Sequence, residues 1–269
     1  MAFYVCSDIH GRYDRYLKLI DMLKEDDMLY ILGDVIDRNP GGIDILKDVM
    51  KRSNVVLLLG NHENFMYEYL FRERQRSLIS KKETDIFNHL REHGYNNIWF
   101  AGNNGGGITF DMFLKEDDET QMEIFKYLSE LPVVVLLDIN GKKFHLSHSG
   151  IMYPDKYNNS AVKENEIITF SRDDLSKNEV SDIVWCSPYR NSEYIPVCDY
   201  PEDYTCIFGH VAVQRIRDDL ENYELYTNEN TICIDGGCAY SSVEEMYPDK
   251  CKTAVICLCL DTMETKYIL

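Results

Sequence analysis

Three short polar runs near the start of the chain carry side chains that bind metal ions. The first run holds Asp8 and His10, the second Asp34 and the third Asn61. Asp34 follows Asp8 by 26 residues and Asn61 follows Asp34 by 27, and a short apolar stretch precedes each run. We therefore expect each run to begin where a strand ends. Ligands from neighbouring strand ends of one sheet can assemble a site for two metal ions.

The ligand types at these positions favour transition metals. Asp8 and His10 are two residues apart, so both can reach one ion from an extended turn. The Asp34 carboxylate can bridge two cations, whereas the Asn61 amide cannot. Imidazole nitrogen mixed with oxygen ligands suits Mn, Fe, Zn or Co better than Ca or Mg. The alternative is structural, because Asp and Asn also cap helices and shape turns after strands. Three runs at matching positions favour the metal site.

Two histidines in the second half of the chain have a similar setting. His148 and His210 each follow an apolar stretch and lie close to a glycine, Gly150 and Gly209 respectively. A single histidine after a strand is more often a hydrogen-bonded core residue than a ligand. Two of them, added to a partial metal site, favour ligation.

Composition and charge narrow the possible partners. The 269 residues are 45% apolar and 28% charged, which fits a single domain spanning residues 1–269. The net charge of −18 argues against a nucleic-acid polymer as partner, because phosphate backbones are bound mainly by Lys and Arg. The same charge disfavours anionic membrane surfaces, and no apolar stretch is long enough to span a bilayer. Nine cysteines without Cys-x-x-Cys spacing, and a start unlike a secretory signal, favour a cytoplasmic protein. The oligomeric state cannot be inferred.

The residues around the polar runs indicate alternating strands and helices. Buried parallel strands are expected over Phe3–Cys6, Met28–Leu32 and Val55–Leu59. Amphipathic helices are expected between them over Tyr13–Lys24 and Ile43–Arg52. In such units the carboxyl ends of the strands share one edge of the sheet, where ligands bind.

The rest of the chain is expected to be helical first and then rich in strands. The expected helices are Asn64–Arg76, Glu83–His93 and Glu119–Leu131, with a glycine-rich break at Asn103–Gly107. The expected strands are Val133–Asp138, Lys143–Ser147, Cys206–Gly209, Thr231–Ile234, Thr253–Leu260 and Thr265–Ile268. Gly141 indicates a hairpin turn, and Asp155–Ser181 is expected to be rich in loops. The fold class is therefore α/β, with a helical insertion after the third strand.

The polar motifs together resemble one known family. They are Ser7-Asp8-Ile9-His10-Gly11, Gly33-Asp34-Val35-Ile36-Asp37-Arg38, Gly60-Asn61-His62-Glu63, His148-Ser149-Gly150 and Gly209-His210. The set resembles the phosphoprotein phosphatase type of calcineurin-like metallophosphoesterases. It is most similar to small bacterial and phage serine/threonine phosphatases and to the related diadenosine tetraphosphate hydrolases. Further matches are Trp99, Asn104–Thr109, Leu131-Pro132 and Ile234–Gly237.

The resemblance implies a fold and a metal site. The implied fold is a four-layer-type β-sandwich of mixed sheets flanked by helices. The implied cofactors are two divalent transition-metal ions, with Mn preferred and Fe, Zn, Co or Ni as alternatives. The implied ligands are Asp8 and His10 for the first ion, Asp34 for both, and Asn61, His148 and His210 for the second.

The resemblance also implies catalytic roles beside the metals. His62 would protonate the leaving oxygen, Asp37 would orient His62, and Arg38 would clamp phosphate oxygens. Bacterial relatives carry a second phosphate-binding arginine soon after the tryptophan that matches Trp185. The nearest candidate in this chain is Arg190.

Two residues depart from the pattern of the family within its motifs. Ser7 stands where the family has its first glycine, and Asn39 stands where it has the glycine after the arginine. Both residue types tolerate turns, so we expect only local adjustments.

The expected function is a metal-dependent serine/threonine protein phosphatase acting on a phosphoprotein or phosphopeptide. The alternative is a bis(5′-nucleosyl)-tetraphosphatase, which would use the same ions to cleave a dinucleoside polyphosphate. A third possibility is an inactive binding module of the same fold. An inactive module would be expected to lack ligands or the acid, yet all six implied ligands and His62 are present.

Overall fold

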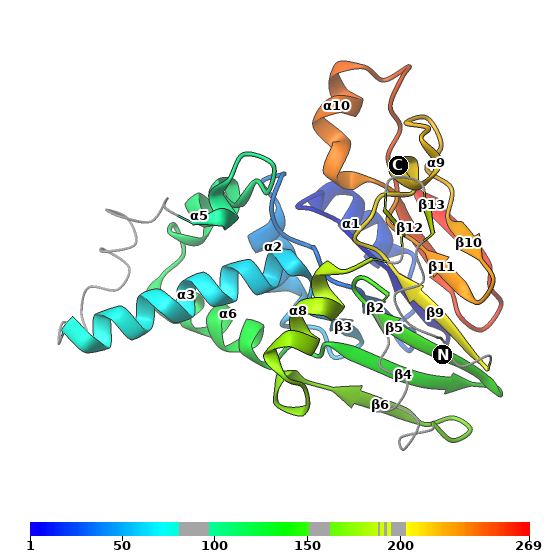
Figure 1. The fold of residues 1–269 in the computed structure, drawn as a ribbon, viewed down its shortest axis with the longest axis horizontal. Helices are drawn as coiled ribbons and strands as arrows, with labels where there is room; N and C mark the ends of the chain where they lie inside the picture. Colours follow the sequence, from blue (N-terminus) through cyan, green and yellow to red (C-terminus); the bar gives the residue numbers. More distant parts are fainter. Residues whose placement is uncertain (81–96, 151–161, 188, 191–192, 195–202) are drawn as a thin grey trace.

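The computed structural model describes residues 1–80, 97–150, 162–187, 189–190, 193–194 and 203–269 of the chain. The side chains of residues 76–80, 190, 193 and 194 lie outside this description, as does the whole of the helix expected at Glu83–His93. Figure 1 shows two sheets surrounded by helices. Among the described residues, no helix is both long enough and apolar enough to cross a membrane.

The three strands expected at the start of the chain form the parallel part of the first sheet. β1 (Phe3–Cys6), β2 (Met28–Ile31) and β3 (Val55–Leu57) pair side by side in parallel. β12 (Val255–Cys259) joins β1 antiparallel, and β13 (Thr265–Ile268) joins β12. The order is β13-β12-β1-β2-β3, so the loops that follow β1, β2 and β3 leave from one edge.

The second sheet is also mixed and has the order β10-β11-β9-β5-β4-β6. Its strands are β4 (Val134–Ile139), β5 (Lys142–Ser147), β6 (Ile167–Phe170), β9 (Tyr204–Phe208), β10 (Tyr226–Asn228) and β11 (Thr231–Cys233). β5 and β9 are parallel neighbours, so the residues after both strands lie at one edge. The expected hairpin at Gly141 joins β4 to β5, and Asn140 and Gly141 have φ values of 54° and 80°.

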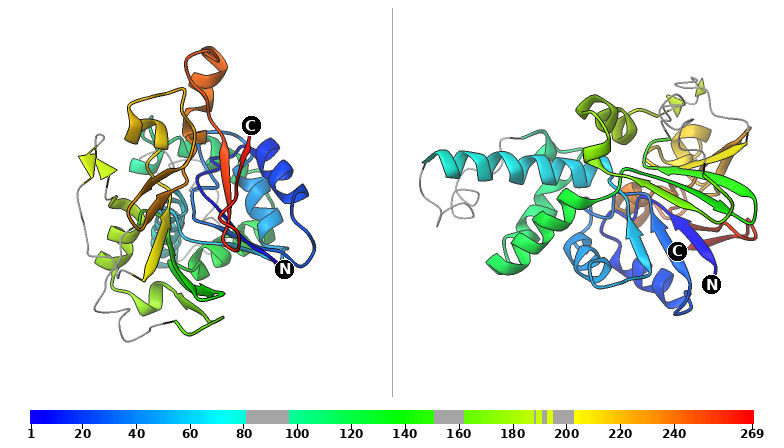
Figure 2. Two further views of the ribbon diagram at one scale, coloured as in Figure 1. Left: turned by 90° about the vertical axis from the view of Figure 1, so that its right-hand side faces the viewer. Right: turned by 90° about the horizontal axis from the view of Figure 1, so that it is seen from below.

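The two sheets face each other across a buried core, and Figure 2 shows them as separate layers. Val5 of β1 and Tyr30 of β2 share one apolar cluster with Val135 and Leu137 of β4. Neighbouring residues belong to a second cluster; Ile31, for example, packs with the helices. Successive side chains of a strand point to opposite faces, so continuous apolar runs indicate strands that are covered on both faces.

Helices cover the outer faces of this sandwich. α1 (Tyr13–Asp21) and α2 (Gly42–Val49) lie beside the first sheet on the side away from the second (Figure 2). The insertion after β3 contains α3 (Asn61–Ser80), η1 (Ile98–Phe100), α5 (Gly106–Phe113) and α6 (Asp118–Glu130). Between β6 and β9 lie η3 (Arg172–Asp174), α8 (Lys177–Trp185) and the hairpin β7 (Tyr189–Arg190) and β8 (Glu193–Tyr194). α9 (Val213–Arg217), η4 (Cys238–Tyr240) and α10 (Ser241–Met246) lie near the end of the chain. The expected mixed α/β fold, with its helical insertion, is confirmed.

Three local expectations are wrong. The described part of Asp155–Ser181 contains β6 and the start of α8 in place of loops alone. Among the described strands, β6 pairs with β4 alone, at the edge of the sheet. Its residues are alternately exposed and half-buried, so their sequence does not show the apolar run of a buried strand. α8 begins with a capping box of Ser176 and Glu179, a local signal that the sequence does contain.

The other two errors concern helices. α5 begins at Gly106, inside the expected glycine-rich break Asn103–Gly107, directly after Gly105 in the left-handed region. α3 begins at Asn61, three residues before its expected start at Asn64, so the third polar run forms its first turn.

Candidate dinuclear metal centre

The loops after β1 and β2 are joined to each other by backbone hydrogen bonds. The amide of Asp8 donates to the Gly33 carbonyl (3.2 Å), and the amide of His10 donates to the Asp34 carbonyl (2.9 Å). Asp8, His10 and Asp34 are all buried, and all have positive φ values of 51°, 46° and 56°. Left-handed backbone in a residue other than glycine costs about 1–3 kcal/mol and gathers at functional sites.

Glu63 fixes the loop that carries Asp34. Its carboxylate is fully buried and accepts the backbone amides of Asp34 (2.7 Å), Val35 (2.9 Å) and Gly60 (3.1 Å). A Cβ added to Gly60 would lie 2.2 Å from Asp34 Oδ1, so only glycine permits this approach. Glu63 therefore ties the second polar run to the third.

The second sheet contributes the two histidines that follow β5 and β9. His148 Nδ1 lies 2.7 Å from the Leu32 carbonyl, so the proton is on Nδ1 and the lone pair is on Nε2. His148 Nε2 lies 2.8 Å from Asn61 Oδ1 and 3.2 Å from His210 Nδ1. His210 Nδ1 is itself 2.9 Å from Asn61 Oδ1. These three atoms converge from two sheets, as ligands of one ion do.

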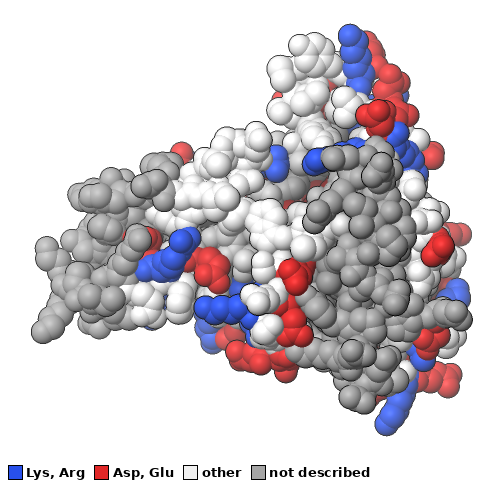
Figure 3. Space-filling model, viewed as in Figure 1, with Lys and Arg blue, Asp and Glu red and all other residues white. Residues whose placement is uncertain are grey.

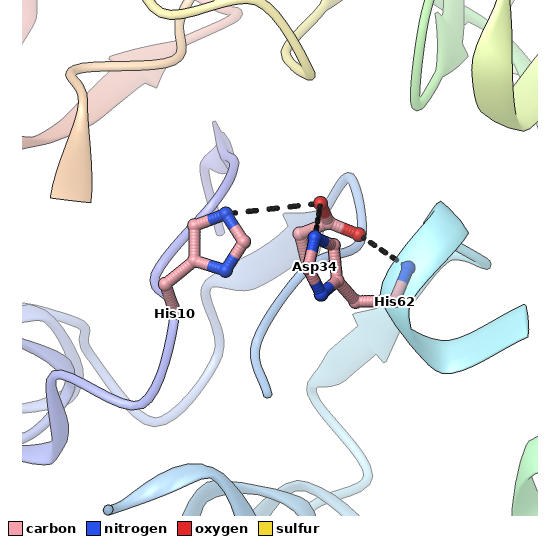
Figure 4. Close-up of side chains that lie close together, drawn as sticks. All are labelled: His10, Asp34 and His62. Carbon is pink, nitrogen blue, oxygen red and sulfur yellow. Dashed lines mark hydrogen bonds and ion pairs between the residues drawn. The ribbon is translucent and has the colours of Figure 1, made fainter. Parts of the chain in front are cut away.

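Four of the six expected ligands, joined by His62, fall into two overlapping groups at the facing edges of the two sheets. His10, Asp34 and His62 form one group, and Asp34, His148 and His210 form the other, with ligand atoms within 4.8 Å of one another in each. Figure 4 shows His10 and His62 directed at the Asp34 carboxylate, whose Oδ2 lies 3.8 Å from His10 Nε2 and 3.7 Å from His62 Nε2. His148 Nε2 is 3.5 Å from the same oxygen. Asp34 is thus common to both groups.

The charges at the centre fit divalent cations. Burial, followed by the charge of Asp8, raises the pKa of Asp34 well above its usual range. Burial, followed by the charge of Asp235, does the same to the pKa of Asp8. Burial also lowers the pKa values of His10 and His148 well below the usual range, which keeps the imidazoles neutral as ligation requires. Asp8 Oδ1 is buried without a hydrogen-bond partner. The donor set therefore fits two transition-metal ions.

His62 is held beside this centre by a hydrogen-bonded carboxylate. Its Nδ1 lies 2.6 Å from Asp37 Oδ2, and the same oxygen accepts the indole N–H of Trp99 (2.7 Å). The amide of Asp37 donates to Thr109 Oγ1 (2.8 Å). Asp37, His62 and Trp99 are all buried. Nδ1 is therefore occupied, and Nε2 is the nitrogen that faces Asp34.

Arg38 and Arg190 are the two arginines that are expected to bind phosphate. Arg38 has a φ of 69°, and its Nε is buried without a hydrogen-bond partner among the described residues. Burial raises the pKa values of Asp34 and Asp235, and the charge of Arg38 partly offsets that rise. Arg38 therefore belongs to the electrostatic environment of the centre. Arg190 lies on β7, but its side chain falls outside the described residues, so its expected role stays a prediction.

An aromatic pair and a cavity adjoin the centre. Trp185 is 37% exposed, and its ring centroid lies 4.8 Å from that of Phe65 and 6.0 Å from that of His210. Farther along α3 and α8, a cavity of about 380 Å³ is lined by residues that include Asn64, Tyr67, Phe71, Arg172, Val180 and Ser181.

Two supporting residues were not identified from the sequence. Glu63 and Trp99 both lie in stretches that match the family, but neither was given a role. The sequence does contain a signal for Glu63, because this acidic residue lies two positions after the expected ligand Asn61. It is on an apolar helix face, where water cannot reach its carboxylate. The partnership of Trp99 with Asp37 joins residues 62 positions apart and has no local signal.

Comparisons with known proteins agree with this geometry. A family model described as "Calcineurin-like phosphoesterase" matches residues 1–214. Symmetrical bis(5′-nucleosyl)-tetraphosphatases of Salmonella paratyphi A (strain ATCC 9150 / SARB42) and Salmonella enteritidis PT4 (strain P125109) are 39% identical over 67 residues, or 23% of this chain and 24% of each relative. The match therefore spans about a quarter of the length of these curated relatives. A crystal structure of a provisionally assigned diadenosine tetraphosphatase aligns with 99% of this chain and 92% of its own at a TM-score of 0.50, with 15% identity. At that identity the likeness concerns the fold alone.

Proposed function

Because the chain belongs to the calcineurin-like phosphoesterase family, whose members are hydrolases that use divalent metal ions, we propose that it is a phosphatase of phosphorylated serine and threonine side chains in proteins. The observation that carries this proposal is the convergence of His10, His148 and His210 on the Asp34 carboxylate, with the His62–Asp37 pair beside it. A phosphoester hydrolase needs both parts, one to supply the nucleophile and one to protonate the leaving group.

The proposed metal site uses the six ligands expected from the sequence. Asp8 and His10 would hold the first ion, Asp34 would serve both, and Asn61, His148 and His210 would hold the second. Mn is the proposed metal, with Fe, Zn, Co or Ni as alternatives, because imidazole ligands suit these ions. When bound, such a pair lowers the pKa of a shared water and so supplies hydroxide near neutral pH.

The protein's own groups handle the proton and the phosphate. In this proposal His62 donates the proton on Nε2 to the oxygen of the departing side chain. Asp37 accepts the hydrogen bond from Nδ1 and stabilises the charged imidazole before transfer. Arg38 offers its guanidinium to the phosphate oxygens, for which its planar fork is suited. Arg190 is a candidate for a second such contact.

Hydrolysis of dinucleoside polyphosphates is the second candidate function. It is favoured by the relatives that match about a quarter of the chain, which are symmetrical bis(5′-nucleosyl)-tetraphosphatases. The same groups would act on a P–O–P bond, and the exposed Trp185 beside the centre offers a face for a base. The protein substrate is preferred here because the net charge of −18 suits basic sequences around a phosphorylated residue better than a polyphosphate.

A nucleic-acid polymer and a membrane are not among the proposed partners. On the face in Figure 3, the described Lys and Arg side chains are interspersed with Asp and Glu and form no continuous basic stripe. Binding to a phosphate backbone depends on such a stripe.

A side-by-side assay tests the proposal. Purified protein loaded with Mn²⁺ is given a phosphoserine peptide with basic flanks, a matched peptide with acidic flanks, and diadenosine tetraphosphate. The proposal predicts the highest kcat/KM with the basic peptide. A higher value with diadenosine tetraphosphate would select the second function, and no hydrolysis of any substrate would reject both.

A further inference from the structure

The two oxygens of the Asp8 carboxylate have different surroundings. Oδ2 accepts two hydrogen bonds, one from the Ser7 hydroxyl and one from the backbone amide of His210 (2.9 Å). Oδ1 is buried, has no hydrogen-bond partner among the described residues, and lies 3.9 Å from His10 Nε2. One oxygen is thus saturated, and the other is available on the side of the neighbouring metal ligand.

The Ser7 hydroxyl is buried beneath the backbone that follows β9. Ser7 is 1% exposed, so water does not replace its hydrogen bond. A Cβ added to Gly209 would lie 2.0 Å from both Ser7 Oγ and Asp8 Oδ2, so the backbone after β9 packs directly over the pair. The hydroxyl and the His210 amide therefore approach Oδ2 from different sheets and hold the carboxylate between them.

The side-chain hydrogen bond to Asp8 Oδ2 comes from Ser7, which stands where the family pattern has a glycine. A glycine at position 7 would leave Oδ2 with the His210 amide as its one donor among the contacts described here. The carboxylate would then be freer to rotate and to present either oxygen. A hydrogen bond to a ligating carboxylate fixes its orientation, and removal of such a partner typically weakens metal binding by about 10–100-fold.

From these contacts we propose that Ser7 is a positioning residue for the metal centre. Its hydroxyl donates to Asp8 Oδ2 and fixes the carboxylate, so that Oδ1 would be the oxygen left to hold the ion. This inference rests on the proposed function, because it requires that Asp8 hold a divalent ion. Ser7 touches neither substrate nor reacting atoms, so its effect is exerted through Asp8.

The test measures Mn²⁺ binding in the absence of substrate. Titrations followed by calorimetry and by the Mn²⁺ electron paramagnetic resonance signal give the Kd of wild type and of Ser7→Ala, Ser7→Gly and Ser7→Thr. We expect Kd to rise about 10–100-fold in the alanine and glycine variants. The threonine variant keeps a hydroxyl and is expected to bind within about threefold of wild type. Wild-type affinity in the threonine variant would show that the hydroxyl, and not the exact size of the side chain, is what metal binding requires.

Ser149→Ala is the matched control. Ser149 is also buried and also adjoins a proposed ligand, His148, but its hydroxyl donates to the Ile183 carbonyl (2.6 Å) and to no carboxylate. Its loss is expected to lower the melting temperature of the metal-free protein while leaving the Mn²⁺ affinity within about threefold of wild type. A purely structural role for Ser7 would give that same result in Ser7→Ala.

The outcomes separate this inference from the proposed function. If wild type binds two Mn²⁺ and Ser7→Ala binds them equally well, the positioning role is rejected and the metal centre stands. If wild type binds no Mn²⁺, Zn²⁺ or Fe²⁺, the metal centre fails and the inference fails with it. If Ser7→Ala does not fold, Ser7→Cys replaces it, because a thiol of similar size is a weak donor and should weaken metal binding in the same way.

Discussion

Asp37 and His62 form a buried pair in which Oδ2 of the carboxylate lies 2.6 Å from Nδ1 of the imidazole. Trp99 donates to the same oxygen, so the carboxylate is held in place while it holds the ring. Asp37 lies in the loop after β2, and His62 lies in the first turn of α3, which follows the neighbouring strand β3. The geometry of the pair is that of an acid with a residue that orients it.

Replacement of Asp37 by Asn is therefore expected to lower kcat by about 100-fold or more. The amide cannot stabilise a charged imidazole, and its NH₂ group favours the wrong tautomer of His62. The loss should be larger for phenyl phosphate than for p-nitrophenyl phosphate, because the poorer leaving group needs the proton more. Trp99→Phe is the control and should cost less than tenfold. Equal losses on both substrates would argue against a role in protonating the leaving group.

Metal removal is expected to destabilise the protein. Asp8 and Asp34 are buried close to each other, and a cation offsets their repulsion. Free Mn²⁺ at 100 times its Kd should stabilise the fold by about 2.7 kcal/mol. For a chain of this size the melting temperature should then rise by roughly 5–10 °C. Scanning calorimetry with and without a chelator measures the shift, and Asp34→Asn should lose most of it.

Glu63 is expected to be a large contributor to stability. Glu63→Gln leaves a single acceptor oxygen for the amides of Asp34, Val35 and Gly60 and turns an NH₂ group towards them. The free energy of unfolding should fall by about 2–4 kcal/mol. Glu68→Gln, on the same helix and partly exposed, should change it by less than about 0.5 kcal/mol. Urea denaturation of the two metal-free variants measures both losses. Equal losses would contradict the stabilising role of the hydrogen bonds that Glu63 accepts.

Asn39 is expected to join the metal-binding loop to α10. Its amide donates to the His10 carbonyl (2.7 Å) and accepts from the Ser241 hydroxyl (3.0 Å). Asn39→Gly, the residue of the family pattern, should lower the free energy of unfolding by about 1–3 kcal/mol. A double-mutant cycle with Ser241→Ala should give a coupling energy of about 0.5 kcal/mol or more. Strict additivity would show that the second hydrogen bond contributes nothing.

His145 is expected to make stability fall in acid. It is fully buried on β5, and burial lowers its pKa to about 3, so the folded state holds the neutral ring. The unfolded state takes up a proton below pH ~6.5, and stability is therefore lost as the pH falls from ~6.5 towards ~3. The slope from this residue reaches about 1.4 kcal/mol per pH unit. The difference between wild type and His145→Gln should shrink across that range, and a constant difference would contradict this prediction.

The sequence alone determined which residues are candidates for the site and which strands position them. Apolar runs with β-branched residues identified the strands, and polar runs directly after them identified Asp8, Asp34, Asn61, His148 and His210. These patterns are local. A short stretch of sequence is enough to show both where a buried strand ends and which side chains follow it. The strand Phe3–Cys6 agrees to the residue for the same reason.

Only the tertiary structure decided how these residues support one another. Pairing of β6 with β4 joins residues that are 30 to 36 positions apart, from Leu137 with Ile167 to Val134 with Phe170, so the polar stretch around β6 has the local pattern of a loop. The Trp99–Asp37 contact, the hold of Glu63 on three amides and the two donors on Asp8 Oδ2 each join separate loops. Long-range packing creates such hydrogen bonds when the two sheets meet, and no periodicity along the chain records them.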